Sequence, residues 1–321
     1  MTETAAGQSA GLAAPYLAAP PDAPEGGRAV WLRAADGVRV RAVLWAGGTA
    51  GTVLIFPGRT EHAEKYARVA ADFAAHGLSA AAVDWRGQGL ADRLLPDPMK
   101  GHVGRFADYQ LDVAALLGAV DAAGLPGPRY LLAHSMGGAI GLRSLIDGLA
   151  VRAAGFSAPM WGIPVPGGLT RLFRAAAHTA VAARLANRYI PPPGTGPICY
   201  AATAPFAGNV LTTDPEGYAW MQRQLRDEPA LQLGGPTFRW LAAALAECAS
   251  LARLPSPPVP CLTTLGTNER VVDPAAVRAR MARWPGGRLM EIPGGEHEVL
   301  MEGPALRRRV VDAMAAHFAA A

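Results

Sequence analysis

Short apolar runs that end at Gly, Pro or Asp recur along the chain and alternate with longer, Ala-rich segments. Both alternate positions of each run are apolar, which is typical of parallel strands buried on both faces. The Ala-rich segments between the runs are predicted to be helices. The predicted strands are 52–56, 78–83, 130–133, 153–156, 260–265 and 288–292, and the predicted helices lie at about 61–76, 107–123, 137–147, 273–284 and 303–320.

Two more polar runs precede this alternation. Residues 28–33 and 38–45 alternate between polar and apolar positions on either side of an Ala-Asp-Gly turn, a pattern that predicts an antiparallel hairpin. Together with the six buried runs, the hairpin indicates an α/β fold class. We expect a mainly parallel eight-stranded sheet with helices on both faces.

The alternation of strand and helix is interrupted once. It stops at about residue 159 and resumes at about residue 256, and the residues between have helical patterns bounded by prolines. We therefore expect a helical cap (lid) at 159–255, inserted into a core domain formed by 28–158 and 256–321. Residues 1–27 contain no Lys or Arg and have four prolines, which argues against a signal peptide and predicts a flexible N-terminal tail.

Composition narrows the functional classes. Half of the 321 residues are hydrophobic and 17% are charged, which excludes a disordered chain and permits a large core. The formal net charge is +4, but no dense Lys/Arg run with interleaved aromatic residues is present, so we expect no nucleic-acid partner. The three cysteines are widely spaced, which argues against a disulfide framework or a cysteine metal site. These features predict a cytoplasmic enzyme.

The clearest chemical signal is a serine between a predicted strand and a predicted helix, in the sequence AHSMGG. A nucleophilic serine at such a sharp turn needs small residues two positions away on each side, and Ser135 has Ala133 and Gly137 there. His134 precedes it, and Met136 places a backbone N–H at the helix N-terminus, directed at an oxyanion. A serine that merely caps a helix is the alternative; the flanking strand and helix favour the nucleophile.

With this turn the chain resembles the α/β-hydrolase fold and, more narrowly, the lysophospholipase L2 and monoacylglycerol lipase group. The resemblance runs from about residue 28 to the C-terminus. Its motifs follow the expected order: FPGRTEH after the third predicted strand, DWRGQG after the fourth, AHSMGG at the turn, and GTNERVVD and GGEHEVL near the end. Within the cap, LTTDPEGY and LGGPT are similar to the lysophospholipase branch. The resemblance implies a cap-bearing hydrolase that acts on lipid esters.

Acyl transfer needs a second N–H donor for the oxyanion, usually from the loop after the third strand. Here Gly58 stands in that loop and the backbone of Arg59 would be the donor, beside Met136. Most relatives have His-Gly where this chain has Pro57-Gly58. A simple turn around Gly58 is the alternative interpretation.

The fold orders its catalytic residues as Ser, then acid, then His. His297 lies in a Gly-rich loop after the last predicted strand and is the expected general base. The acid has two candidates, Glu269 and Asp273, which both follow the strand at 260–265. Asp273 precedes Pro274, an arrangement typical of a helix N-cap. Glu269 has no such local role and stands where relatives usually carry Asp, so we favour Glu269 and keep Asp273 as the alternative.

Several other chemistries lack their motifs. The sequence contains no GxxxxGK[ST] and no HExxH, and the GxGxxG-like fragment at 87–92 lacks its third glycine. We therefore expect no metal and no cofactor. An Asp at the turn would indicate a dehalogenase or an epoxide hydrolase, and Ser135 argues against both.

The cap offers two indications of the substrate. Residues 148–213 contain no Asp or Glu but several arginines, which are Arg152, Arg171, Arg174, Arg184 and Arg188. These arginines could form a basic face suited to anionic head groups and to transient membrane contact. Alternatively, they are ordinary arginines whose aliphatic stems cover apolar surface, and we favour this second interpretation. The apolar cap residues that could line an acyl pocket are Trp161, Leu172, Phe173, Trp220, Met221, Phe238 and Trp240.

The sequence thus predicts a serine hydrolase that cleaves carboxylic esters of single-chain lipids, either lysophospholipids or monoacylglycerols, through an acyl-enzyme on Ser135. The alternatives on the same fold are a short-chain carboxylesterase, a thioesterase and a cofactor-free haloperoxidase. A non-catalytic binding protein is a further alternative, which the complete set of serine, acid and histidine argues against.

Overall fold

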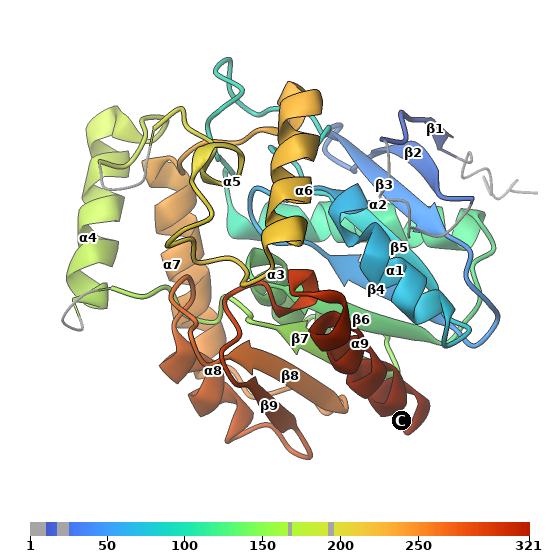
Figure 1. Cartoon of the computed structure of the whole chain (residues 1–321). Helices are drawn as coiled ribbons and strands as arrows, with labels where there is room; N and C mark the ends of the chain where they lie inside the picture. The colour runs from blue at the N-terminus through green and yellow to red at the C-terminus, as the bar shows by residue number, and fades with distance from the viewer. Residues whose placement is uncertain (1–10, 18–25, 166–168, 192–195) are drawn as a thin grey trace, which may run out of the picture.

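A mixed sheet forms the centre of the molecule (Figure 1). The computed structural model describes residues 11–17, 26–165, 169–191 and 196–321. The order of the strands across the sheet is β1-β2-β3-β5-β4-β6-β7-β8-β9. Their bounds are β1 Leu12–Ala13, β2 Arg28–Arg33, β3 Arg39–Trp45, β4 Thr52–Phe56, β5 Ser79–Asp84, β6 Arg129–His134, β7 Ala153–Ser157, β8 Cys261–Gly266 and β9 Arg288–Ile292.

The direction of the strands follows the sequence pattern. β2 and β3 form the antiparallel hairpin, and β3 also pairs antiparallel with β5. From β5 to β9 every neighbouring pair is parallel. The prediction of a mainly parallel sheet is therefore confirmed, and the eight predicted strands are β2 to β9. The two-residue strand β1 is an addition at the edge, where it pairs antiparallel with β2.

Residues 11–17 lie against the sheet. Beyond the pairing of β1, the backbone oxygen of Pro15 accepts a hydrogen bond from Arg41 Nη1 at 2.7 Å, and the hydroxyl of Tyr16 accepts one from Trp45 Nε1 at 3.1 Å. The prediction of a flexible tail over 1–27 is wrong for these residues, because their partners lie on β2 and β3 and leave no local signal in the sequence. The rest of that prediction, at 1–10 and 18–25, lies outside the described residues.

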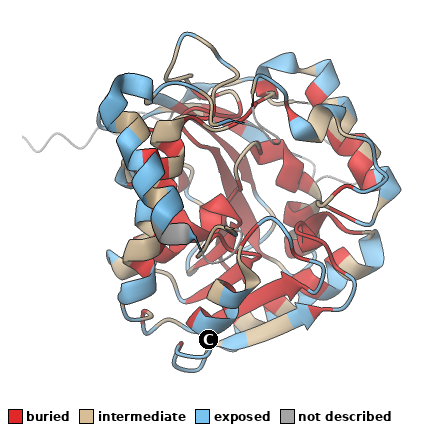
Figure 2. Cartoon of the chain, turned by 90° about the vertical axis from the view of Figure 1, so that its left-hand side faces the viewer, coloured by how far each residue is buried: buried red, intermediate tan, exposed pale blue. Residues whose placement is uncertain are grey.

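Helices cover both faces of the sheet (Figures 1 and 2). Among the described residues, none of them is long and apolar enough to cross a membrane. The α-helices are α1 Ala67–Ala74, α2 Tyr109–Ala122, α3 Met136–Ile146, α4 Thr170–Ala180, α5 Tyr200–Thr203, α6 Pro215–Asp227, α7 Phe238–Arg253, α8 Pro274–Met281 and α9 Pro304–Ala319. The shorter turns are η1 Ala63–Tyr66, η2 Phe106–Asp108, η4 Val181–Leu185, η5 Pro229–Leu231 and η6 Val299–Met301.

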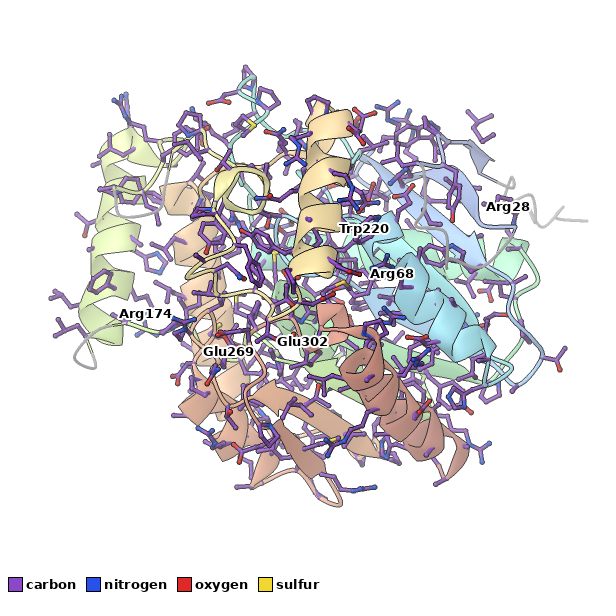
Figure 3. All side chains as sticks on the ribbon, in the orientation of Figure 1. Arg28, Arg68, Arg174, Trp220, Glu269 and Glu302 are labelled. Carbon is purple, nitrogen blue, oxygen red and sulfur yellow. The ribbon has the colours of Figure 1, made fainter. Side chains whose placement is uncertain are left out.

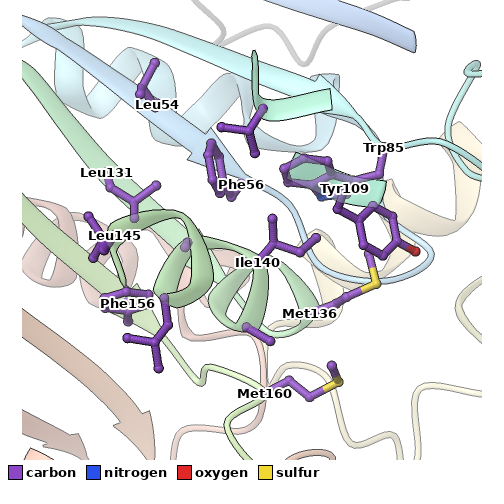
Figure 4. Close-up of a cluster of buried hydrophobic side chains, with 14 of the residues drawn as sticks. Leu54, Phe56, Trp85, Tyr109, Leu131, Met136, Ile140, Leu145, Phe156 and Met160 are labelled. Atoms are coloured by element: carbon purple, nitrogen blue, oxygen red, sulfur yellow. The ribbon is translucent and has the colours of Figure 1, made fainter. Parts of the chain in front are cut away.

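Alternate strand residues face different helices, as expected for strands buried on both sides. Leu54 and Phe56 of β4 join the cluster formed with α2, α3 and α8, part of which is drawn in Figure 4. Val53 and Ile55, between them in sequence, join the cluster formed with α1 and α9. All four side chains are fully buried, and each contributes about 1.5–3 kcal/mol to folding.

The segment between β7 and β8 supplies α4 to α7. α7 packs on the α3 side of the sheet through residues such as Trp240 and Leu251, while α6 packs on the α1 side through Trp220. There the guanidinium of Arg68 lies 5.0 Å from the centre of the Trp220 ring (Figure 3). Helices from this one segment therefore contact both layers of the core. Part of its predicted proline break, at 192–193, lies outside the described residues.

Candidate active site

Four loops meet at the carboxyl edge of the parallel strands. β6 lies between β4 and β7 in the sheet, and Ser135 follows it directly. Arg59 follows β4, Glu269 follows β8, and His297 follows β9. Since the carboxyl ends of parallel strands share one edge, this topology brings residues far apart in sequence into one crevice.

The backbone at Ser135 has a strained conformation, with φ 50° and ψ −120°. Such a conformation costs about 1–3 kcal/mol and persists only where its surroundings hold it. Its N–H donates to the oxygen of Ser157 at 3.1 Å, and its own oxygen accepts from the N–H groups of Gly138 and Met160, each at 2.8 Å. These three hydrogen bonds fix the turn between β6 and α3.

Small residues around the turn are required by close backbone contacts. A Cβ atom on Gly137 would lie 2.1 Å from the carbonyl oxygen of Phe56, so only glycine fits there. At the other small position, Ala133 carries a methyl group where the usual motif has glycine. A Cβ atom on Gly141 would lie 3.1 Å from the Cβ of Ala133. Gly141, one turn along α3, therefore provides the room that the extra methyl group needs.

A chain of hydrogen bonds joins the three predicted residues. His297 Nε2 lies 3.0 Å from Ser135 Oγ, and His297 Nδ1 lies 2.7 Å from Glu269 Oε2. All three residues are buried. With Nδ1–H directed at a carboxylate, Nε2 is left as the acceptor for the serine proton.

The carboxylate of Glu269 is held at both oxygens. Its Oε1 accepts hydrogen bonds from the N–H groups of Val271 and Val272, at 2.6 and 3.0 Å. Burial alone would raise the pKa of Glu269, but the hydrogen bond and charge of His297 together with these two N–H groups lower it below its ordinary value. Glu269 is therefore ionised at neutral pH and suited to stabilise an imidazolium.

The alternative acid, Asp273, has a different place. Its Oδ1 accepts from the N–H groups of Ala275 and Ala276, at 2.9 and 3.4 Å, and caps the N-terminus of α8. The structure brings Glu269, rather than Asp273, to the imidazole of His297.

Two backbone N–H groups border Ser135. The N–H of Met136 begins α3, and neither it nor the N–H of Arg59 donates a hydrogen bond to a residue that the structure describes. The loop that carries Arg59 lies against Ser135, because a Cβ atom on Gly58 would lie 3.0 Å from the Cβ of Ser135. Both donors are thus available to an oxyanion formed at the serine.

The loop between β4 and η1, at 57–62, is fixed by side chains that the sequence interpretation did not assign. Gln88 Nε2 donates to the oxygens of Gly58 and Glu61, at 2.7 and 3.1 Å, and Trp85 Nε1 donates to the oxygen of Pro57 at 2.9 Å. The carboxylate of Glu61 accepts from the N–H of Gly58. The fragment around Gln88, which resembles a dinucleotide motif, therefore supports the oxyanion loop.

Glu61 also belongs to a buried ionic cluster beside His297. Lys65 Nζ lies 2.8 Å from Glu61 Oε1 and 2.7 Å from Glu298 Oε2, and Tyr66 donates its hydroxyl to Glu61 at 2.6 Å. The ring centre of His134 lies 4.7 Å from that of His297. Two signals in the sequence could have indicated this cluster: Lys65 is one of two lysines in the chain, and Glu298 directly follows His297, the expected general base.

The same cluster contains a set of metal-ligand atoms. Those of Glu61, His134 and Glu298 lie within 4.8 Å of one another. Both carboxylates, however, already bond to the ammonium of Lys65, and His134 Nδ1 bonds to the oxygen of Ser157 at 2.9 Å. Lys65 supplies the positive charge that the two carboxylates require.

A pocket of about 400 Å³ opens beside Ser135 and His297. This volume falls at the small end of the range of about 300–1,000 Å³ that is usual for ligand pockets. Its polar lining comes from the residues described above together with Thr60 and Tyr200. Its apolar lining includes Met160, Ile163, Val210, Leu211, Trp240, Leu241, Val271 and Val272.

Of the cap residues expected to line an acyl pocket, Trp240 does so. The expectation fails for Leu172 and Phe173, which are exposed on α4, and for Trp220 and Met221, which pack with the α1 side of the core. Helical spacing does not distinguish a face that lines the pocket from one that packs in the core, because both carry large apolar residues.

Comparisons with known proteins agree with this geometry. Residues 47–304 match the family model described as serine aminopeptidase, S33. The chain is 38% identical to lysophospholipase L2 of Escherichia coli K12, with 83% of this chain and 79% of that protein covered. It is 31% identical to the probable lysophospholipase L2 of Haemophilus influenzae, with 81% and 80% covered.

A solved structure shows the same fold at lower identity. A soluble variant of monoglyceride lipase from Saccharomyces cerevisiae, in complex with a substrate analogue, is 20% identical and has a TM-score of 0.71. The match covers 95% of this chain and 98% of that one. The chain has the α/β-hydrolase fold and belongs to the serine aminopeptidase S33 family of hydrolases.

Proposed function

We propose that this protein is a serine hydrolase that cleaves the carboxylic ester of a single-chain lipid, a lysophospholipid or a monoacylglycerol. One observation carries the proposal: the hydrogen-bonded chain of Ser135, His297 and Glu269 borders a mainly apolar pocket. The similarity to lysophospholipase L2 over four-fifths of the chain supports the same substrate class.

The reaction follows from the geometry. His297 Nε2 removes the proton of Ser135 Oγ as that oxygen attacks the ester carbonyl, and the N–H groups of Arg59 and Met136 hold the resulting oxyanion. His297 then gives the proton to the leaving alkoxide, and the acyl group remains on Ser135. Water, deprotonated by His297, attacks this acyl-enzyme and releases the fatty acid, and the proton returns to Ser135.

The pocket favours lipid esters over peptides. An aminopeptidase would need a carboxylate free to bind the substrate's terminal ammonium. The pocket carboxylates other than the acid of the triad, Glu61 and Glu298, both bond to Lys65. The apolar lining and the modest volume suit one acyl chain.

A substrate panel tests the proposal. It compares 1-oleoyl lysophosphatidylethanolamine, 1-oleoylglycerol, p-nitrophenyl esters from acetyl to palmitoyl, palmitoyl-coenzyme A and alanine p-nitroanilide, with the Ser135→Ala variant as control. We expect the highest kcat/KM on the long-chain oxygen esters and no turnover by the variant. Preference for the acetyl ester, the thioester or the anilide would refute the substrate class.

We further propose that the cap, residues 159–255, touches lipid surfaces transiently. Large apolar side chains are exposed mainly in this segment: Leu169, Leu172, Phe173, Leu185, Ile198, Tyr200 and Phe206. Arg174 lies on the same helix, α4, as Leu172 and Phe173 (Figure 3). The paired replacement Leu172→Ser and Phe173→Ser should lower turnover of vesicle-bound lysophospholipid more than turnover of p-nitrophenyl acetate. Equal effects on both would contradict membrane contact.

A further inference from the structure

The side chain of Arg59 occupies a niche in the wall of the pocket that holds Ser135. Its Nη2 donates to the oxygen of Gly234 at 2.5 Å, and its Cζ lies 5.2 Å from the centre of the Trp240 ring. Gly101 forms the floor of the niche, since a Cβ atom there would lie 2.1 Å from Nη2. The guanidinium is therefore held in one position by a carbonyl, an aromatic face and a residue without a side chain.

The positive charge of Arg59 has no carboxylate partner among the described residues, and its Nε is buried without a hydrogen bond. Two other buried cations are paired with carboxylates: Arg41 with Glu64 and Asp84, and Lys65 with two glutamates. A third, Arg280, is held by the oxygens of Leu251, Leu254 and Ser256 and does not line the pocket. Burial lowers the pKa of Arg59 to about 10, so the group remains cationic at neutral pH. A part-buried cation in a pocket wall, with no carboxylate to neutralise it, is a site for an anion.

Given the ester hydrolysis proposed above, on which this step rests, we propose that the Arg59 guanidinium binds the phosphodiester of a lysophospholipid substrate while the N–H of the same residue holds the ester oxyanion. The other cation in the pocket lining, Lys65, already bonds to the carboxylates of Glu61 and Glu298, which would themselves repel a phosphate. Arg59 is then a specificity-determining residue that favours lysophospholipids over monoacylglycerols, whose head group is uncharged.

The chemistry of the substrate matches this spacing. Two paths have the same length when counted in bonds. One runs from the ester carbonyl carbon to the phosphorus of a 1-acyl lysophospholipid. The other runs from the backbone nitrogen to the guanidinium carbon of an arginine. One residue can therefore contact both ends of the glycerol unit. The hydroxyl of a monoacylglycerol can accept a hydrogen bond at this place but leaves the charge of Arg59 uncompensated.

The test is the ratio of kcat/KM on 1-oleoyl lysophosphatidylethanolamine to kcat/KM on 1-oleoylglycerol, measured for the wild type and for Arg59→Gln. Because charge-assisted hydrogen bonds to phosphate are strong, we expect the variant to lower this ratio about tenfold or more. Arg226→Gln is the matched control: it removes one positive charge from an exposed position on α6, and the ratio should stay at the wild-type value. An equal loss on both substrates in Arg59→Gln would overturn the inference and leave the ester hydrolase intact.

A second variant keeps the inference testable if circular dichroism shows that Arg59→Gln does not fold. Gly101→Ala keeps the charge but displaces the guanidinium from its niche, and it should lower the same ratio. An unchanged ratio in Gly101→Ala, with the protein folded, would also overturn the inference. A wild type that cleaves neither lipid would refute the proposed function itself, and the anion site with it.

Discussion

At the scale of single residues, two carboxylates four positions apart have separate tasks. Glu269 reaches His297 with one oxygen and accepts two backbone N–H groups with the other, so its longer side chain bridges the loop and the imidazole. Asp273 caps α8. The sequence favours Glu269 because a helix cap already accounts for Asp273. A recognisable helix cap can exclude a catalytic candidate in the same way in other sequences.

Replacement of these two residues should have unequal effects on catalysis. Glu269→Gln loses the charge that stabilises the imidazolium and gives Nδ1 an amide partner, so we expect kcat to fall about 10³-fold or more. Asp273→Asn keeps a good cap, since Asn is as effective as Asp at this position, and kcat should stay within about twofold.

Steady-state kinetics on a long-chain p-nitrophenyl ester measure both variants, and thermal unfolding shows whether each is folded. A larger loss in Asp273→Asn than in Glu269→Gln, with both folded, would assign the acid to Asp273.

At the scale of elements, the loop that carries Arg59 and the loop that carries His297 are joined by one side chain. Lys65, on η1, bonds to Glu61 of the first loop and to Glu298 of the second. Glu61 in turn accepts from the N–H of Gly58, the residue before Arg59. The sequence could single out Lys65 and Glu298 but could not indicate that they bond to each other, because they are 233 positions apart.

Loss of this link should weaken both folding and catalysis. Lys65→Met leaves two buried carboxylates without their cation, a change that costs about 3–5 kcal/mol in the free energy of unfolding. We also expect kcat to fall, because the loops that carry Arg59 and His297 lose their common contact. Urea denaturation and esterase assays well below the unfolding temperature measure the two effects.

The other lysine of the chain serves as the matched control. Lys100 is partly exposed and lies 3.9 Å from Asp97, so Lys100→Met should cost less than about 1 kcal/mol and leave kcat unchanged. If Lys65→Met resembles Lys100→Met in both measurements, the cluster has no structural role.

At the scale of the whole molecule, the sequence predicted what depends on local pattern. The buried strands, the helices between them and the sharp turn at Ser135 each follow from residues within a few positions of one another. The attachment of residues 11–17 and the ionic cluster around Lys65 depend on contacts between distant segments, which no local pattern encodes. The division into a core and a cap at 159–255 stays a prediction.

The stability of the whole molecule should respond to acid through buried histidines. Burial lowers the pKa of both His62 and His134 to about 4. The unfolded chain then binds more protons than the native one between pH 6.5 and 4, so this stabilisation is present above pH 6.5 and is lost as the pH falls toward 4. For one such histidine the loss between pH 7 and 5 is about 2 kcal/mol.

A comparison of variants separates the effect of the histidines from that of buried carboxylates. Burial raises the pKa of Asp112 to about 6, so its contribution to the pH dependence of stability has the opposite sign. Urea denaturation at pH 7 and pH 5 gives the free energy of unfolding at each pH. Between the two, the free energy of unfolding of His62→Gln should fall by about 2 kcal/mol less than that of the wild type. His178→Gln, at an exposed position of α4, should lose as much as the wild type. The expectation fails if both variants show the same dependence on pH.

The central claim is that Ser135, activated by His297, forms the covalent intermediate. The most direct measurement is labelling of the full chain with a fluorophosphonate, followed by intact-mass and peptide mass spectrometry. We predict a single label on Ser135 in the wild type, no label in Ser135→Ala and strongly slowed labelling in His297→Gln. A wild type that takes no label, or that takes it on a serine other than Ser135, would contradict the account.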